Sequence, residues 1–145
     1  DRLAGAREIF PDAPVYRTVE SSIDQGEIAG RALFADVSAR PTAVIAQSDL
    51  LALGVIRAAR GAGLRVPEDV SVTGFYRVVV DGAGADSLTT VVQDAHAKGR
   101  AVGRLLLDAL EGFAPTSVQI PCIFRRGNTT GFLALGIDEG APVPR

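Results

Sequence analysis

The fold is decided by residues 41–76, which read PTAVIAQSDLLALGVIRAARGAGLRVPEDVSVTGFY. An apolar run from Ala43 to Ala46 predicts a buried strand, and apolar residues then recur at helical spacing from Leu50 onward. These helical positions are Leu50, Leu53, Val55, Ile56 and Ala59. A second apolar strand is expected from Val70 to Phe75. A strand, a helix and a strand in this order form the unit from which parallel sheets are built, with a right-handed crossover.

Both ends of the central helix carry residues suited to them. Asp49 is expected to be the N-cap, because its carboxylate accepts orphan backbone N–H groups at the positive end of the helix dipole. Gly61 and Gly63 are expected to stop the helix, since glycine adopts the left-handed conformation at little cost. Pro67-Glu68-Asp69 predicts the turn into the second strand.

Polar residues follow both strands of this unit. Gln47-Ser48-Asp49 comes after the first strand, and Phe75-Tyr76-Arg77 comes at the end of the second. In parallel sheets, ligands bind beyond the carboxyl ends of the strands. The sequence therefore predicts a binding site at these two strand ends.

The N-terminal part predicts further elements of the same kind. Residues 1–10 are typical of an amphipathic helix, which the prolines within residues 11–14 end. The apolar side of this helix carries Leu3, Ala6 and Phe10. Val15–Val19 alternates as a short strand, and a helix is expected over Ile23–Ser38. Glu20-Ser21-Ser22 fits either a loop or the N-cap of that helix.

The C-terminal part predicts one more strand, a long helix and an edge strand. Leu88–Val92 favours a strand, and residues 94–111 form the longest helical pattern, which Gly112 closes. The apolar face of this helix carries Val102, Leu105, Leu106, Ala109 and Leu110. Residues 118–124 are strand-like on both sides of Pro121, which indicates a sheet edge or a crossing between sheets. The tail from Asp138 to Arg145 has little to bury and is expected to be loose.

Composition bounds the class of protein. With 145 residues, 47% of them hydrophobic, the chain is long enough for one domain with a substantial core. The net charge of −2 and the lack of a long basic run argue against DNA binding by this chain itself. The single cysteine, Cys122, excludes an internal disulfide and is expected to be a buried small hydrophobe. No apolar stretch approaches the ~20 residues of a membrane span, and no signal-peptide pattern opens the chain.

The residues give little support for catalysis. The sequence contains neither a Walker-type phosphate loop nor a nucleophile elbow, so a nucleotide enzyme of similar fold lacks its motif. His96 is the only histidine, and it lies within a predicted helix. The aspartates at 49, 69, 81 and 86 are spread over loops and caps, with no spacing that pairs two carboxylates. We therefore expect no enzyme, no cofactor and no metal site.

Several motifs resemble the lactose-repressor (LacI/GalR) family of bacterial transcription regulators. The stretch 41–75 followed by LTTVVQ is similar to its effector-binding domain, and Arg65–Ser71 reads as the family's signature for that turn. DRLAGA at residues 1–6 and RRGNTTG near the end extend the resemblance to nearly the whole chain. The implied fold class is α/β: a parallel-sheet, three-layer Rossmann-like lobe of the type I periplasmic-binding-protein fold, incomplete, and looking like its C-terminal half.

The resemblance also implies a ligand site. In this family the effector, usually a sugar or a purine, lies between two lobes and is held by polar side chains at strand ends. By motif, Arg2 matches an effector-contacting arginine, Ser48 a polar contact, and Tyr76 a position usually held by an acid. Ser21 lies where relatives place another pocket residue, and Asp49 is either a ligand contact or only the helix cap.

One departure from the family pattern concerns charge. The family usually reads Gly-Phe-Asp-Asp or Gly-Tyr-Asp-Asn where this chain reads Gly74-Phe75-Tyr76-Arg77. Replacing two acids by Tyr-Arg moves the local charge by about three units in the positive direction. We therefore expect the pocket to favour an anionic or ring-stacking effector over a neutral sugar, with weak or absent binding as the competing outcome.

The family's two lobes imply three segments in this chain. Residues 1–92 correspond to the C-terminal lobe, 93–122 to the other, mostly absent lobe, and 123–145 to the return crossing and a loose tail. Without that lobe, four large apolar side chains of helix 94–111 face water, which forfeits roughly 6–12 kcal/mol as an upper bound. Either the helix folds back, or a second chain covers it, or the rest of the protein covers it. A covering partner, such as a swapped copy, is our expectation.

The function that the resemblance implies is effector sensing and dimerisation in a LacI-type regulator of the cytoplasm. An absent N-terminal helix-turn-helix would bind DNA, and a small molecule, sugar-like, would control it. Leu50, Leu53 and Gly84 fit a homodimer contact, although Leu53 fits the core equally well. The alternative is a periplasmic sugar-binding protein of an ABC transporter, and the upstream gene sequence distinguishes the two.

Overall fold

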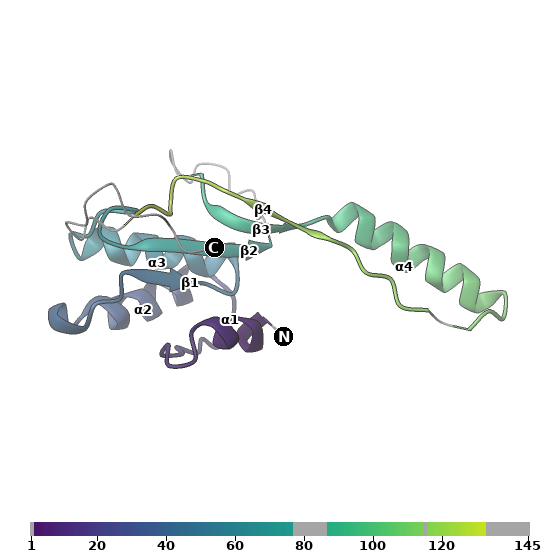
Figure 1. Ribbon diagram of the computed structural model, residues 1–145, viewed down its shortest axis with the longest axis horizontal. Coiled ribbons are helices and arrows are strands. Elements are labelled where there is room, and N and C mark those ends of the chain that lie inside the picture. Colours follow the sequence, from purple (N-terminus) through teal and green to yellow (C-terminus); the bar gives the residue numbers. More distant parts are fainter. Residues whose placement is uncertain (1, 77–86, 115, 133–145) are drawn as a thin grey trace.

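A computed structural model describes residues 2–76, 87–114 and 116–132 of the chain (Figure 1). These residues form an α/β fold around an open four-stranded sheet. The elements are, in order, α1 (Arg2–Ile9), α2 (Ile23–Phe34), the 3-10 turn η1 (Val37–Ala39), β1 (Ala43–Ile45), α3 (Asp49–Gly61), β2 (Ser71–Tyr76), β3 (Thr89–Gln93), α4 (Ala95–Leu110) and β4 (Cys122–Arg125).

The sheet has the order β1-β2-β3-β4, and its first three strands are parallel. Val44 of β1 lies opposite Val72 of β2, and Gly74 of β2 lies opposite Thr90 of β3. β4 returns antiparallel to β3, with Phe124 opposite Val91. The α/β class with a largely parallel sheet is confirmed. β4 forms an edge of the sheet, one of the two alternatives that Pro121 indicated.

Two helices, α2 and α3, form the helical layer that covers the sheet. Their close crossing depends on glycine, because a Cβ on Gly54 would lie 2.1 Å from the carbonyl oxygen of Ile23 and one on Gly26 would lie 2.3 Å from that of Leu51. The core lies between this layer and the sheet. It consists of Phe34, Ala46, Ala52, Val55, Ile56, Ala58, Ala59, Val70 and Val72.

The hydroxyl groups of two serines begin these helices. Ser22 caps α2 by accepting from the backbone N–H of Gln25 at 3.2 Å, which decides the alternatives for residues 20–22 in favour of the cap. Ser48 caps α3 by accepting from the N–H of Leu51 at 3.2 Å. The prediction that Asp49 is the cap is therefore wrong. The serine one residue earlier has the extended backbone that a cap needs, and Asp49 is the first helical residue.

Several predicted boundaries differ from the structure. The helix from Ile23 ends at Phe34, because Asp36 accepts from the N–H of Ser38 at 2.9 Å and begins the separate turn η1. Gly61 is still helical, whereas Gly63 adopts the left-handed conformation with φ 77°. The strand predicted at Val15–Val19 is absent, since this segment makes no ladder pairing. Residues 118–120 likewise form no strand.

Burial differs from expectation at both edges of the sheet. β1 is less buried than predicted, because it is an edge strand and the side chain of Ile45 remains 52% exposed. Cys122, expected in the interior, is exposed, because no described residue of the edge strand β4 is buried. The predicted tail and the loop of residues 77–86 lie outside the described residues.

Helix α4 projects away from the rest of the fold (Figure 1). Asp94 begins it by accepting from the N–H of Ala97 at 2.8 Å, and this hydrogen bond lowers the pKa of the carboxyl group. None of its residues is buried, and its apolar face is open to solvent. The exposed fractions are 66% for Val102, 59% for Leu106 and 75% for Leu110. In the single chain, α4 therefore does not fold back onto the sheet.

Candidate functional site

The carboxyl ends of the three parallel strands meet at one edge of the sheet. Gln47 and Ser48 follow β1, Tyr76 ends β2 and Gln93 ends β3. Parallel register brings these ends together. The residues after β1 and those at the end of β2 are therefore neighbours, as the sequence predicted.

Arg2 reaches this edge from α1. Its Nη1 donates to the carbonyl oxygen of Gln47 at 2.6 Å, and its guanidinium carbon lies 4.5 Å from the centre of the Phe75 ring. One contact is made to Gln47, two residues after the end of β1, and the other to Phe75 of β2. Arg2 is therefore held at the strand ends and is not a free surface arginine.

Ser21 and Ser48 also come together here. Their hydroxyl oxygens are 2.5 Å apart, and either can be the donor. Ser48 lies at the start of α3, and Ser21 lies in the loop before α2. Because the close crossing of α2 and α3 fixes both helix starts, the two hydroxyl groups are set in place by the fold rather than by a mobile loop.

Tyr76 ends β2 in an unusual backbone conformation. Its φ is 108°, in the region that residues with a side chain rarely adopt, and its side chain is 51% exposed. Lys98, in the first turn of α4, places its ammonium nitrogen 6.0 Å from the centre of the Tyr76 ring. Lys98 also donates to the side-chain oxygen of Gln93. The strand ends thus carry two cations, Arg2 and Lys98.

Gln93 and Lys98 lie beside the predicted site residue Tyr76, and the sequence reasoning did not single them out. A signal for Gln93 was present, since it is the last residue of a parallel strand at the same sheet edge. Lys98 had no comparable signal. Its position depends on where the strand β3 passes into α4.

Asp49 faces the interior of the fold. It is 2% exposed, and its Oδ1 accepts from the hydroxyl of Thr90 on β3 at 2.6 Å. Only glycine fits at position 74 beside it, because a Cβ there would lie 2.3 Å from the same Oδ1. The carboxylate thus joins α3 to β3 beneath the site. A direct ligand contact by Asp49 stays a prediction.

Other predicted residues lie outside this group. Leu50 and Leu53 are half-buried on α3 and do not belong to the buried core, and their dimer role stays a prediction. Gly84 lies outside the described residues, as does Arg77. His96 is exposed on α4 with Arg100 as its neighbour.

Neither a metal centre nor a membrane helix is found in the part of the chain that the structure describes. No three His, Cys, Asp or Glu side chains group there in a way that could hold a metal ion. No helix among these residues is both long and apolar enough to span a bilayer.

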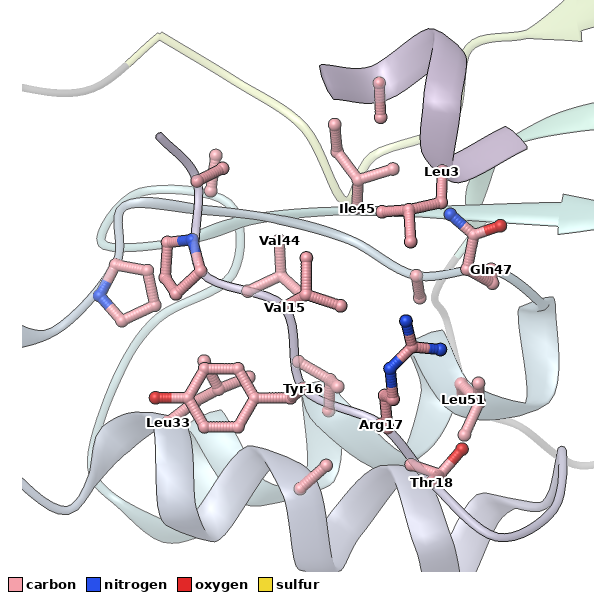
Figure 2. A pocket seen from close by; sticks show the side chains of 18 of the residues that line it. Leu3, Val15, Tyr16, Arg17, Thr18, Leu33, Val44, Ile45, Gln47 and Leu51 are labelled. Carbon is pink, nitrogen blue, oxygen red and sulfur yellow. The ribbon is translucent and has the colours of Figure 1, made fainter. Parts of the chain in front are cut away.

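A separate cavity of about 510 Å³ lies beside β1, with α1 forming part of its wall (Figure 2). α1, residues 13–18, α2, β1 and α3 all contribute to its walls. Of the residues at the strand ends, Gln47 lines this cavity, whereas Arg2, Ser21, Ser48 and Tyr76 do not. The cavity and the group of strand-end residues are therefore neighbouring but distinct.

Comparison with known proteins gives the family. Residues 2–130 match the model of the periplasmic binding protein-like domain. The chain is 41% identical over 111 residues to the HTH-type transcriptional regulator MalR of Streptomyces coelicolor, which covers 74% of this chain and 31% of that protein. It is 32% identical over 136 residues to the ribose operon repressor of Bacillus subtilis, and this match covers 90% of our chain and 41% of the repressor. The chain thus spans less than half the length of these relatives.

Solved structures agree in fold. A lac repressor dimer bound to operator and the anti-inducer ONPF matches with a TM-score of 0.78 at 30% identity, over 92% of this chain and 47% of that one. A LacI family regulator from Lactobacillus casei with bound glucose matches with a TM-score of 0.64 at 26% identity, over 75% of our chain and 40% of the regulator. The matching relatives are regulators and not enzymes. The chain belongs to the periplasmic binding protein-like domain family, in the form found in LacI-type transcriptional regulators.

Proposed function

We propose that this chain is the effector-sensing and dimerisation part of a bacterial LacI-type regulator. The observation that carries the proposal is the group formed by Arg2, Ser21, Ser48 and Tyr76 at the carboxyl ends of parallel strands. An upstream helix-turn-helix would bind DNA, and ligand-driven movement of lobes would change its affinity.

The effector we propose is a small, sugar-like molecule. The regulator from Lactobacillus casei is described with glucose and with sucrose bound, which favours this class. In our chain the Ser21 and Ser48 hydroxyls suit the hydroxyl groups of a sugar, since each donates and accepts. Binding by the two serine hydroxyl groups requires no cofactor, and we propose no catalytic step.

Charge and an aromatic face favour an anionic effector within that class. Arg2 and Lys98 approach the strand ends from α1 and α4, on either side of β2. A guanidinium fork binds a phosphate or carboxylate in two parallel hydrogen bonds, which is the strong form of such contacts. The Tyr76 ring, half-exposed beside Lys98, offers a face on which a ring can stack.

The exposed face of α4 supports the three-segment division. In this proposal, residues 1–92 belong to one lobe, 93–122 to a second lobe, and 123–145 return to the first. The solvent-exposed side chains of Val102, Leu106 and Leu110 then pack against that second lobe, or against a partner chain. Burying each would gain about 1.5–3 kcal/mol.

Dimerisation is proposed through α3. Leu50 and Leu53 remain half-buried in the single chain, so they retain apolar surface for a self-complementary contact. Gly84 would lie in the same contact. A cytoplasmic location follows from the proposed DNA-binding role.

A periplasmic sugar-binding protein is the second candidate for this fold. The relatives named as HTH-type regulators favour the first reading. The gene sequence upstream of Asp1 separates them: a helix-turn-helix supports the regulator, and a signal peptide contradicts it.

Calorimetric titration of the full-length protein, which contains both lobes, with glucose, ribose and glucose 6-phosphate tests the site. We expect the phosphate ester to bind most tightly. Ser21→Ala should weaken that binding roughly threefold to tenfold. Ser22→Ala is the matched control, because Ser22 caps α2 and should alter stability without altering affinity. Equal weakening by both variants, or tight binding that is indifferent to the phosphate, would contradict the proposed site.

A further inference from the structure

Asp49 is a buried charge at a helix start where another residue already supplies the cap. Ser48 caps α3, and Asp49, the next residue, is 2% exposed. Burying a carboxylate costs free energy unless hydrogen bonds and favourable charges compensate for it. The positive end of the α3 dipole favours the carboxylate, and the hydroxyl of Thr90 on β3 donates to its Oδ1 at 2.6 Å. The start of α3 is thus tied to a strand of the sheet, which capping alone does not require.

The contact between Asp49 and Thr90 passes over Gly74 of β2. Gly74 lies opposite Thr90 in the parallel register of β2 and β3. A Cβ on Gly74 would lie 2.3 Å from Oδ1 of Asp49 and 3.2 Å from its Cα. Because position 74 has no side chain, the first turn of α3 lies directly against β2 while its carboxylate reaches β3.

The turn that carries Ser48 is fixed at both of its ends. Before it, the backbone N–H of Ala46 donates to a carbonyl oxygen of β2 at 2.9 Å. After it, Asp49 is held by the hydroxyl of Thr90 on β3. Only residues 47 and 48 lie between these two points. The Ser48 hydroxyl therefore has little freedom to move relative to the strand ends.

From these contacts we propose that Thr90 is a positioning residue for the effector site. Through Asp49 it holds the Ser48 hydroxyl beside that of Ser21, so that the two groups meet a ligand together. Thr90 is 3% exposed, so it acts through Asp49 and not by contact with the ligand. This inference rests on the function proposed above for the strand-end group, and it adds a residue below the site that sets the geometry of the site.

Hydrogen exchange in the full-length protein tests the positioning step without any ligand. The amide of Leu51 donates to the Ser48 hydroxyl at 3.2 Å, so its exchange reports whether Ser48 keeps its place. Thr90→Val should raise exchange in the first turn of α3 at least roughly threefold relative to that of β2, because this turn loses its tie to β3. Thr90→Ser, which keeps the hydroxyl, should leave this ratio within about twofold of the unmodified protein.

Thr129→Val is the matched control, because it also removes a buried hydroxyl that bonds to the sheet. Thr129 is 0% exposed, and its hydroxyl donates to the carbonyl oxygen of Val72 at 2.7 Å and accepts from the N–H of Thr89 at 3.0 Å. These partners lie on β2 and β3 and not on α3. Both Thr129→Val and Thr90→Val should lower the melting temperature, but only Thr90→Val should raise exchange selectively in the first turn of α3.

Calorimetric titration of the same proteins with glucose 6-phosphate tests the effect on the site. Thr90→Val should weaken binding roughly threefold to tenfold, whereas Thr90→Ser and Thr129→Val should stay within about twofold. If the unmodified protein does not bind the ester, the proposed effector is wrong, and selective exchange in Thr90→Val still supports the positioning role. Equal effects of Thr90→Val and Thr129→Val on exchange or on affinity would overturn the inference, as would failure of Thr90→Ser to restore both.

Discussion

Removing the hydroxyl of Thr90 should destabilise the fold at the point where the site rests on the sheet. Thr90 on β3 is 3% exposed, and its hydroxyl donates to Oδ1 of Asp49 at 2.6 Å. Asp49 is itself 2% exposed and begins α3, one residue after Ser48. Thr90→Val keeps the shape of the side chain and leaves the buried carboxylate with one hydrogen bond fewer.

The expected cost follows from that lost contact. Taking one partner from a buried charged group costs about 1–3 kcal/mol in free energy of unfolding. For a chain of this size each kcal/mol lowers the melting temperature by roughly 2–4 °C, so we expect a decrease of about 2–12 °C. A double-mutant cycle with Asp49→Asn should give a coupling energy of about 0.5–3 kcal/mol, since the two side chains are in contact.

Urea denaturation monitored by circular dichroism measures these free energies. Thr42→Val is the matched control, because Thr42 is exposed and the substitution should change stability by less than about 0.5 kcal/mol. If Thr90→Val behaved like Thr42→Val, or if the cycle gave no coupling, the buried contact between β3 and α3 would not support the fold as described.

Two further predictions concern the helix crossing and the signature turn. Gly54→Ala should destabilise the chain by at least 1–3 kcal/mol, because its Cβ would lie 2.1 Å from the carbonyl oxygen of Ile23; Gly99→Ala, with nothing within 4 Å, should instead stabilise by about 0.5–1 kcal/mol. Denaturation of both variants measures this, and a similar effect of the two would contradict the close crossing. The Arg65 side chain hydrogen-bonds Asp69 and lowers the pKa of that carboxyl to about 2. At low pH the unfolded chain therefore binds more protons at Asp69 than the folded chain does. The stability that this pair contributes is complete above about pH 4 and is lost as the pH falls through about 2. Asp69→Asn should flatten this part of the stability profile between pH 4 and pH 2, and an unchanged profile would contradict the pairing.

Local patterns in the sequence were enough to predict the parallel unit. Periodicity shows which residues share one face of one helix or strand. Three such patterns are present: the apolar run after Pro41, the helical spacing from Leu50 and the strand after Asp69. The structure confirms β1, α3 and β2 within one or two residues of the predicted bounds. The strand ends followed from this, because parallel register places them at one edge.

The predictions that were wrong concern features that depend on contacts between residues distant in sequence. Whether Val15–Val19 forms a strand depends on pairing with the edge of β1, and nothing local to those residues reports it. The exposure of Cys122 depends on what covers β4. The cap of α3 was misplaced by one residue, because Ser48 and Asp49 both suit a cap, and the hydroxyl of Thr90 holds Asp49 inside.

The strand-end group could be predicted only in part. Arg2, Ser48 and Tyr76 were identified by motif, and the structure places them at the predicted strand ends. Lys98 was not identified, because its place beside Tyr76 depends on the direction in which α4 leaves β3. The cavity beside β1 was also not foreseen, since it lies between segments that periodicity treats separately.

The central claim is that the strand-end group binds the effector, and one comparison of affinities tests it most directly. Calorimetric titration with glucose 6-phosphate should be performed on the full-length protein, which supplies both lobes, and on its Arg2→Leu and Arg7→Leu variants. Both arginines lie on α1, but only Arg2 contacts Gln47 and Phe75. The account predicts that Arg2→Leu weakens binding at least roughly tenfold, the value of a charge-assisted hydrogen bond, and that Arg7→Leu leaves it within about twofold. Equal affinities for all three proteins would contradict it.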